Sequence, residues 1–132
     1  MNNRQVFNLI LPLALVLVLA SGTRVLALTV TQAVICQEVV DRMPVGSGDV
    51  IPAGTQRVFC FTRIAEAQGQ TEIVHNWYYQ GVLKASVVLP VRASEWRTWS
   101  SKTLLPQWTG EWMVEVLTKD GTPLESIIFF VQ

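Results

Sequence analysis

The sequence predicts an all-β fold, an antiparallel sandwich of about seven strands that follows an N-terminal export segment. Three observations lead to this prediction. Beyond residue 27, apolar side chains recur at period two, which is typical of strands rather than helices. Turn residues interrupt these apolar segments about every ten residues, as they do in sandwich domains. The remaining chain, roughly 100 residues, is long enough for one such domain and too short for two.

The N-terminus has the three-part pattern of a secretory signal peptide. Residues 9–20 (LILPLALVLVLA) are uninterrupted apolar residues, with Arg4 before them and small or aliphatic residues at 25–27. The run is shorter than the ~20 residues that a spanning helix needs. We therefore expect residues 1–27 to be the signal peptide and residues 28–132 to form the domain, exported to the periplasm or another extracytoplasmic space. Cleavage after Gly22, a buried core helix and an uncleaved membrane anchor over residues 6–20 are the alternatives.

Charge and motifs exclude several classes of function. Removing residues 1–27 takes away Arg4 and Arg24, so ten basic residues become eight against ten acidic ones, a net charge near −2. A nucleic-acid partner would require a dense basic face, and none is predicted. No nucleophile motif adjoins the single histidine, and no phosphate loop, calcium loop or zinc helix is present in the sequence. No catalytic residue, metal or cofactor is therefore predicted, and membrane contact is expected only through an uncleaved N-terminal segment.

Each predicted strand ends at recognisable turn residues. The first strand runs into Arg42-Met43-Pro44, and residues 45–55 form a loop with three glycines and a proline. Residues 65–70 turn the chain, Gln80-Gly81 is a tight turn, and residues 104–110 are a loop. Lys119-Asp120-Gly121 is a hairpin turn. The strands are expected over residues 31–40, 57–64, 72–79, 82–91, 95–102, 111–118 and 124–131.

Alternation also assigns the faces of the strands. Trp77 shares one side of its strand with His75, and Trp112 shares a side with Val114 and Val116, while Glu111 and Glu115 mark the other side as exposed. We expect the Trp77 and Trp112 sides to face the core, together with Val87, Leu89 and Val91. Pro90 places its strand at a sheet edge, because proline donates no ladder hydrogen bond.

Two cysteines, Cys36 and Cys60, lie on the first two predicted strands. An even pair in an exported chain predicts a disulfide between them. Two free buried thiols are the alternative. Two scattered cysteines and one histidine do not have the spacing of a zinc site.

Several short motifs also follow one another in a recognisable order. They are Val-x-x-Arg-x-Pro (Val39, Arg42, Pro44), Phe61-Thr62, His-x-Trp-Tyr (His75, Trp77, Tyr78), Leu89 to Val91, the run WRTWSSK from Trp96 to Lys102, Gly-x-Trp-x-Val (Gly110, Trp112, Val114), an Asp-Gly turn and Phe-x-Val (Phe129, Val131). This order resembles the bacterial domain-of-unknown-function family 2914 across essentially the whole chain after the export segment. The resemblance implies an exported or membrane-tethered protein with an immunoglobulin-like sandwich. It implies no activity and no binding residues.

The run from Trp96 to Lys102 is the best candidate for a binding surface. In a strand, Trp96 and Lys102 face one way while Arg97 and Trp99 face the other, so we expect one tryptophan near the surface. An aromatic ring beside hydrogen-bond donors can hold a sugar or a peptide segment. The candidate binding residues are Trp96, Arg97, Trp99, Lys102 and His75. The alternative is that both tryptophans pack structurally and that His75 is hydrogen-bonded at the core margin.

The last predicted strand carries apolar residues on both sides. Ile127, Phe129 and Val131 share the core side, so Ile128 and Phe130 point away from it. Two exposed apolar side chains on a bare edge strand favour pairing with a partner. We expect this strand to contact another protein, a second copy of the chain or the N-terminal segment.

These observations predict a non-enzymatic binding or assembly module of the bacterial cell envelope, with a protein or glycan partner. The first alternative is a carbohydrate-binding module that uses surface tryptophans. The second is an uncharacterised envelope enzyme.

Overall fold

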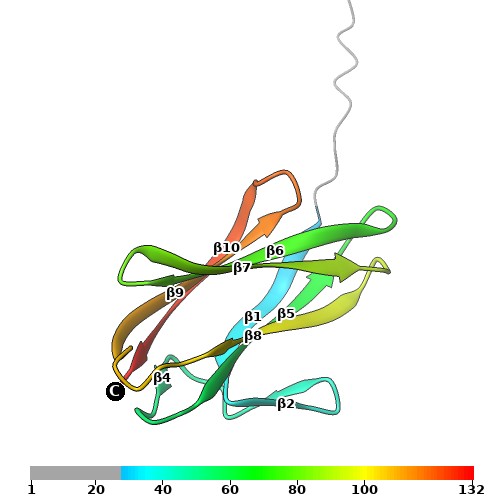
Figure 1. Ribbon diagram of the computed structural model, residues 1–132. Helices are drawn as coiled ribbons and strands as arrows, with labels where there is room; N and C mark the ends of the chain where they lie inside the picture. The colour runs from blue at the N-terminus through cyan, green and yellow to red at the C-terminus, as the bar shows by residue number, and fades with distance from the viewer. Residues whose placement is uncertain (1–27) are drawn as a thin grey trace, which may run out of the picture.

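The computed structural model describes residues 28–132, and the signal peptide expected over residues 1–27 lies outside this range. The described residues form ten strands and no helix, so they contain no helical segment able to cross a bilayer (Figure 1). The strands are β1 (Thr29–Cys36), β2 (Glu38–Val40), β3 (Met43–Val45), β4 (Val50–Ile51), β5 (Arg57–Ala65), β6 (Thr71–Tyr79), β7 (Val82–Val91), β8 (Trp96–Thr103), β9 (Gly110–Thr118) and β10 (Pro123–Val131).

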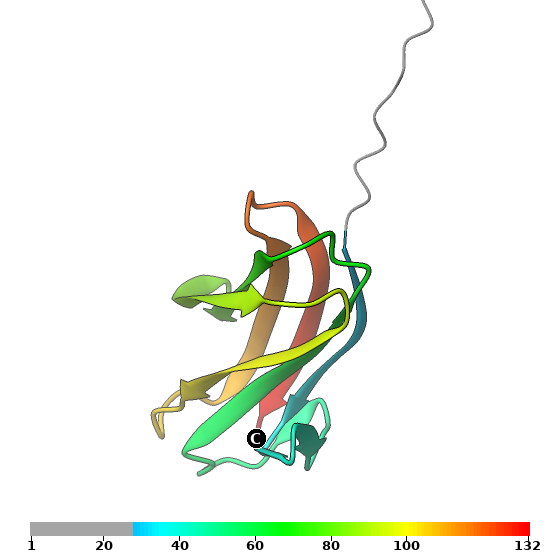
Figure 2. The same ribbon diagram turned by 90° about the vertical axis from the view of Figure 1, so that its right-hand side faces the viewer.

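Two sheets make up the sandwich. One has the strand order β1-β5-β8, and the other has the order β4-β10-β9-β6-β7. Every pairing is antiparallel except the short one between β4 and β10. Figure 2 shows the two layers facing each other, with the small β2–β3 hairpin beside the three-stranded sheet. The predicted immunoglobulin-like antiparallel sandwich is confirmed.

The core lies between the inner faces of the two sheets. Trp77 and Trp112 are fully buried, and both rings contact Phe129, one edge-on at 6.2 Å between centroids and one stacked at 6.1 Å. Val91 is also buried, so the faces predicted for these strands are confirmed. Aromatic side chains contribute most to such a core because each buries a large apolar area.

Most of the predicted strand boundaries are also confirmed. Six predicted strands, from residues 57–64 onward, match β5 to β10 to within one residue at each end. Pro90 lies in β7, which is an edge strand of the five-stranded sheet, as expected for a residue without an amide hydrogen.

The predicted first strand is different in the structure. It bends at Gln37 into β1 and β2, and Met43–Val45 pairs back on β2 as β3. The hairpin turn places both Asp41 (φ 49°) and Arg42 (φ 60°) in the left-handed region. Two-residue hairpin turns with positive φ at both central positions favour Asn-Gly or Asp-Gly, so the Asp-Arg sequence does not reveal this turn.

The predicted disulfide between Cys36 and Cys60 is wrong, because both cysteines are free and buried. The register pairs Cys60 with Ile35, and Cys36 with Phe59. Neighbouring residues of a strand point to opposite faces of the sheet. Cys60 therefore faces the core with Ile35, while Cys36 faces the β2–β3 hairpin on the other side. Burial raises the pKa of both thiols, so both remain protonated at neutral pH.

We predict that Trp77→Ala and Trp112→Ala each lower the free energy of unfolding by about 3–5 kcal/mol, because each removes a fully buried aromatic side chain. Urea titration followed by circular dichroism measures this. The control is Val88→Ala, a residue that is 57% exposed and should cost little. A tryptophan variant as stable as the control would contradict the assigned core.

Candidate functional site

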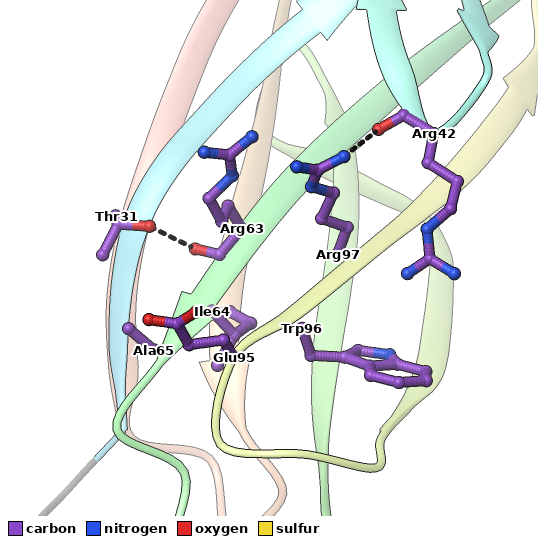
Figure 3. Close-up of a pocket in the computed structure, with 8 residues that line it drawn as sticks. All are labelled: Thr31, Arg42, Arg63, Ile64, Ala65, Glu95, Trp96 and Arg97. Atoms are coloured by element: carbon purple, nitrogen blue, oxygen red, sulfur yellow. Dashed lines mark hydrogen bonds between the residues drawn. The ribbon is translucent and has the colours of Figure 1, made fainter.

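Two adjoining hollows border the edge strand β8. The larger, about 500 Å³, lies where β1, β5 and β8 run side by side (Figure 3). The smaller, about 320 Å³, continues toward the end of β7. They share Arg42, Trp96 and Arg97, and we call them together the arginine cleft. The larger hollow is lined by Thr31, Arg42, Arg63, Ile64, Ala65, Glu95, Trp96 and Arg97, and the smaller one adds Pro90, Arg92, Thr98 and Trp99.

The arginine cleft concentrates positive charge on a domain with a small net negative charge. Arg63 comes from β5, Arg97 from β8 and Arg42 from the β2–β3 turn, whereas Glu95 is the one acidic residue in either lining. With Arg92, four of the eight basic residues of 28–132 border the cleft. Arg63 and Arg97 stand directly opposite each other in the β5–β8 pairing, an arrangement of like charges that destabilises a sheet.

Contacts between the hairpin and β8 hold two of these arginines, Arg97 and Arg42, in place. Arg97 Nη1 donates to the carbonyl oxygen of Arg42 at 3.4 Å and lies 3.5 Å from the sulfur of Met43. The Arg42 guanidinium lies 5.6 Å from the ring centroid of Trp96, a cation–π distance. Figure 3 shows the Arg63 and Arg97 side chains extending in the same direction from adjacent strands.

Arg63 is the least satisfied of these arginines. Its Nε is buried and has no hydrogen-bond partner within the described residues. A buried donor without a partner costs about 1–3 kcal/mol, and guanidinium groups form paired hydrogen bonds to carboxylate and phosphate oxygens. The cleft can therefore hold an oxyanion.

The two tryptophans of the WRTWSSK run are both half-buried, rather than one buried and one exposed. Trp96 packs against a core cluster that includes Ile64 and lies under Arg42. Trp99 stacks on Phe61, with 6.1 Å between centroids and 17° between planes. Both rings border the cleft, but each has a structural contact as well.

Lys102 lies at the opposite end of β8, about 20 Å from Trp96 at the usual rise of an extended strand. Its ammonium group is 5.1 Å from the ring centroid of Trp108, and that of Lys84 is 5.5 Å from the same ring. Trp108 in turn contacts Tyr79 and Trp112. The structure therefore separates Lys102 from the other predicted binding residues of its strand.

His75 is fully buried between the sheets and does not line the cleft. Its Nδ1 lies 2.7 Å from Ser100 Oγ and its Nε2 lies 3.3 Å from Thr62 Oγ1. Thr62 donates its hydroxyl hydrogen to the carbonyl of Thr98, and Trp77 Nε1 donates to Ser100 Oγ.

These partners determine where the hydrogens of the network lie. Since the Thr62 hydrogen is already donated, Thr62 can only accept from His75 Nε2–H. His75 Nδ1 must then accept from the Ser100 hydroxyl, because a neutral imidazole has one donor and one acceptor. Burial also lowers the pKa of His75 to about 4, so the ring is neutral at pH 7. The sequence is compatible with His75 either as a binding residue or as a hydrogen-bonded residue at the core margin, and its position in the structure agrees with the second hypothesis.

Ile128 and Phe130 lie on the outer face of the five-stranded sheet, 50% and 41% exposed. The register continues from Ile128 to Met113, then to Tyr78 and Leu83, so an apolar row crosses four strands. The expectation that β10 is a bare edge strand is wrong at its C-terminal end, because β4 pairs with Phe130 and Val131. The outward orientation of Ile128 and Phe130 follows the alternation seen in the sequence.

Of the residues that line the arginine cleft, the sequence indicated Trp96, Trp99 and Arg97 as binding candidates. It did not indicate Arg42, Arg63, Arg92 and Glu95. The missed residues are far apart in the chain and meet only through strand pairing and the hairpin. In the described part of the chain, no three His, Cys, Asp or Glu side chains gather in a way that could hold a metal ion.

Fold and site together define an immunoglobulin-like β-sandwich with a basic cleft at one edge strand. A family model described as "Protein of unknown function (DUF2914)" matches residues 70–131, which supports the resemblance of this stretch of the chain to that family. The match runs from β6 to β10 and includes the WRTWSSK run, while Arg42 and Arg63 lie outside it. No curated protein matches the chain.

The depressed pKa of His75 predicts a loss of stability in mild acid. Because the pKa of His75 is about 4 in the folded state and the ordinary value of 6.5 applies to the unfolded chain, the unfolded state binds more protons between these values. The contribution of neutral His75 to the free energy of unfolding is thus present above pH 6.5 and is lost as the pH falls. Between pH 7 and pH 5 we expect the free energy of unfolding to decrease by about 2 kcal/mol from this group. Urea unfolding at both pH values measures it.

The control for this prediction is His75→Gln, which removes the titrating group. Its stability should fall less than that of the wild type over the same pH interval, since only the carboxylates then contribute. Equal decreases in the two proteins would show that His75 does not titrate in this way.

Proposed function

We propose that this chain is a non-enzymatic binding or assembly module of the bacterial cell envelope, and that it holds its ligand in the arginine cleft. The observation that carries the proposal is the convergence of Arg42, Arg63 and Arg97 on one hollow from three separate elements. Gathering like charges destabilises the free protein, and an anionic group in the cleft would reverse this cost.

The cleft is also partly preorganised for binding. Arg97 is held by a main-chain carbonyl of the hairpin, and Arg42 rests on Trp96. Side chains that are already ordered lose less conformational entropy when a ligand binds. The location of this function in the cell envelope is supported by the sequence pattern of residues 1–27 alone.

Two alternatives from the sequence receive less support. A carbohydrate-binding module that relies on surface tryptophans would present their rings as open platforms, yet Trp96 lies under Arg42 and Trp99 stacks on Phe61. An enzyme could use a Ser–His pair, but Ser100 and His75 are buried and border neither hollow of the cleft. Both observations favour a binding role for the charged groups of the cleft.

We predict that the full-length protein cosediments with purified cell-envelope material and that Arg97→Gln weakens this binding about tenfold or more. A charge-assisted hydrogen bond contributes enough for such a change. Quantitative cosedimentation measures the affinity. The matched control is Arg57→Gln, which removes an exposed arginine from the far end of β5 and should bind like the wild type.

If Arg97→Gln and Arg57→Gln lowered the affinity equally, the binding would depend on net charge alone, and a site in the cleft would be contradicted. Binding unchanged in the Arg97 variant would contradict it as well. Release of modified envelope fragments by the wild-type protein would favour the enzyme instead.

The apolar row that contains Ile128 supports a second proposal, self-association through the outer face of the five-stranded sheet. Four apolar side chains in register form a patch rather than isolated exposed residues. Tyr78 and Met113 in its middle are half-buried, and Ile128 and Leu83 at its ends are each 50% exposed.

We predict that the double variant Ile128→Thr and Phe130→Thr keeps its stability to within about 1 kcal/mol, because both side chains are substantially exposed. Its self-association should weaken, as measured by sedimentation velocity. Val88→Thr, on the same face but outside the row, is the control. A wild-type chain that stays monomeric at all concentrations would rule out self-association, and an unfolded double variant would place these residues in the core.

A further inference from the structure

We propose that the ligand of the arginine cleft is an anionic polysaccharide, a sugar polymer whose carboxylate groups bind between Arg63 and Arg97. This inference rests on the proposed binding function and names the chemical class of its ligand. Three features of the larger hollow carry it: its donors, its acceptors and its apolar wall.

The donors require an oxyanion. The lining of the hollow contains three guanidinium groups and a single carboxylate, Glu95, so it has two uncompensated positive charges. Arg63 Nε is buried without a partner in the described chain, and Arg97 uses Nη1 for the hairpin. The planar guanidinium presents its donors as a fork that matches the two oxygens of a carboxylate. A neutral sugar would leave these charges uncompensated.

The acceptors require a ligand that also donates. Glu95 is exposed at the rim of the hollow, and an ionised carboxylate only accepts hydrogen bonds. Thr31, which stands at the bulge in β1, donates its hydroxyl to the carbonyl of Arg63 at 3.2 Å, so its oxygen can accept from a ligand. A sugar acid carries a carboxylate and several hydroxyl donors on one ring. Its groups therefore match the mixed lining better than the acceptor-only side chains of an acidic peptide.

The wall of the hollow supplies apolar contact. The half-buried Trp96 lines it beside the charged groups, and the part of its side chain that stays exposed beside Arg42 can contact a ligand. The C–H face of a sugar ring can pack on such an aromatic surface, whereas polyphosphate and small inorganic ions have no apolar groups to do so. The smaller hollow continues past Pro90 and Trp99, so a polymer can extend beyond one sugar unit.

The test measures binding of the full-length protein to four polymers of similar length: polygalacturonate, polyphosphate, poly-glutamate and neutral dextran. Tryptophan fluorescence detects binding, and isothermal calorimetry gives the affinity. The variants are Arg63→Gln, Arg97→Gln and, as matched control, Arg57→Gln, which removes the same charge from the same strand outside the cleft.

We expect polygalacturonate to bind, with Arg63→Gln and Arg97→Gln each weakening it about tenfold to a hundredfold and Arg57→Gln changing it less than twofold. Binding should weaken as salt is raised from low to physiological concentration. Glu95→Gln keeps the hydrogen-bond acceptor but removes the opposing charge, so it should not weaken binding.

Other outcomes overturn the inference in different ways. Equal or tighter binding of poly-glutamate would identify an acidic peptide as the ligand, and equal binding of polyphosphate would reduce the site to a general anion site. Binding of dextran alone would overturn the anionic class. In each of these cases, sensitivity to Arg97→Gln would leave the proposed function in place. The proposed function itself would be overturned by a different result: a wild-type protein that does not bind envelope material, and cleft variants that bind the polymers as the wild type does.

Discussion

The hydrogen-bond network around His75 is the interaction on which the arrangement of the two sheets depends. His75 and Trp77 belong to β6 in the five-stranded sheet, whereas Thr62 and Ser100 belong to β5 and β8 in the other. Each buried polar group in this network finds its partner on the opposite sheet or on a neighbouring strand. A one-residue slip of any of these strands would expose one member and leave another buried without a partner, at a cost of about 1–3 kcal/mol per orphaned group.

The arginine cleft follows from the same register. Thr62 and Thr98 pair across β5 and β8 and point into the sandwich, so the next pair, Arg63 and Arg97, must point outward on the same side. The inward hydrogen bonds thus determine that two like charges stand opposite each other on the outer surface. The β2–β3 hairpin then adds Arg42, and its main-chain carbonyl holds Arg97. Core packing and the charged surface are therefore consequences of one strand pairing.

Most of the fold can be predicted from the sequence because strands and turns are local patterns. The alternation around Trp77 and Trp112 assigned their faces correctly, and Pro90 correctly indicated an edge strand. The hairpin could not be predicted, since its turn uses Asp41 and Arg42 in a conformation that usually favours glycine or asparagine. The disulfide prediction failed because an even number of cysteines says nothing about register, and the register places Cys36 and Cys60 on opposite faces of their sheet.

The sequence by itself determined the all-β class, the strand boundaries from β5 to β10, the core tryptophans and the position of the run from Trp96 to Lys102 on one strand. These depend on periodicity and turn residues, which are properties of short segments. Only the tertiary structure decided that Lys102 belongs to the far end of the sandwich, that His75 is an internal hydrogen-bonding group, and that Arg42 and Arg63 join Arg97 in one cleft. The physical reason is that these relations depend on which strands pair and in which register, and pairing is decided by the burial of the whole core rather than by any one segment.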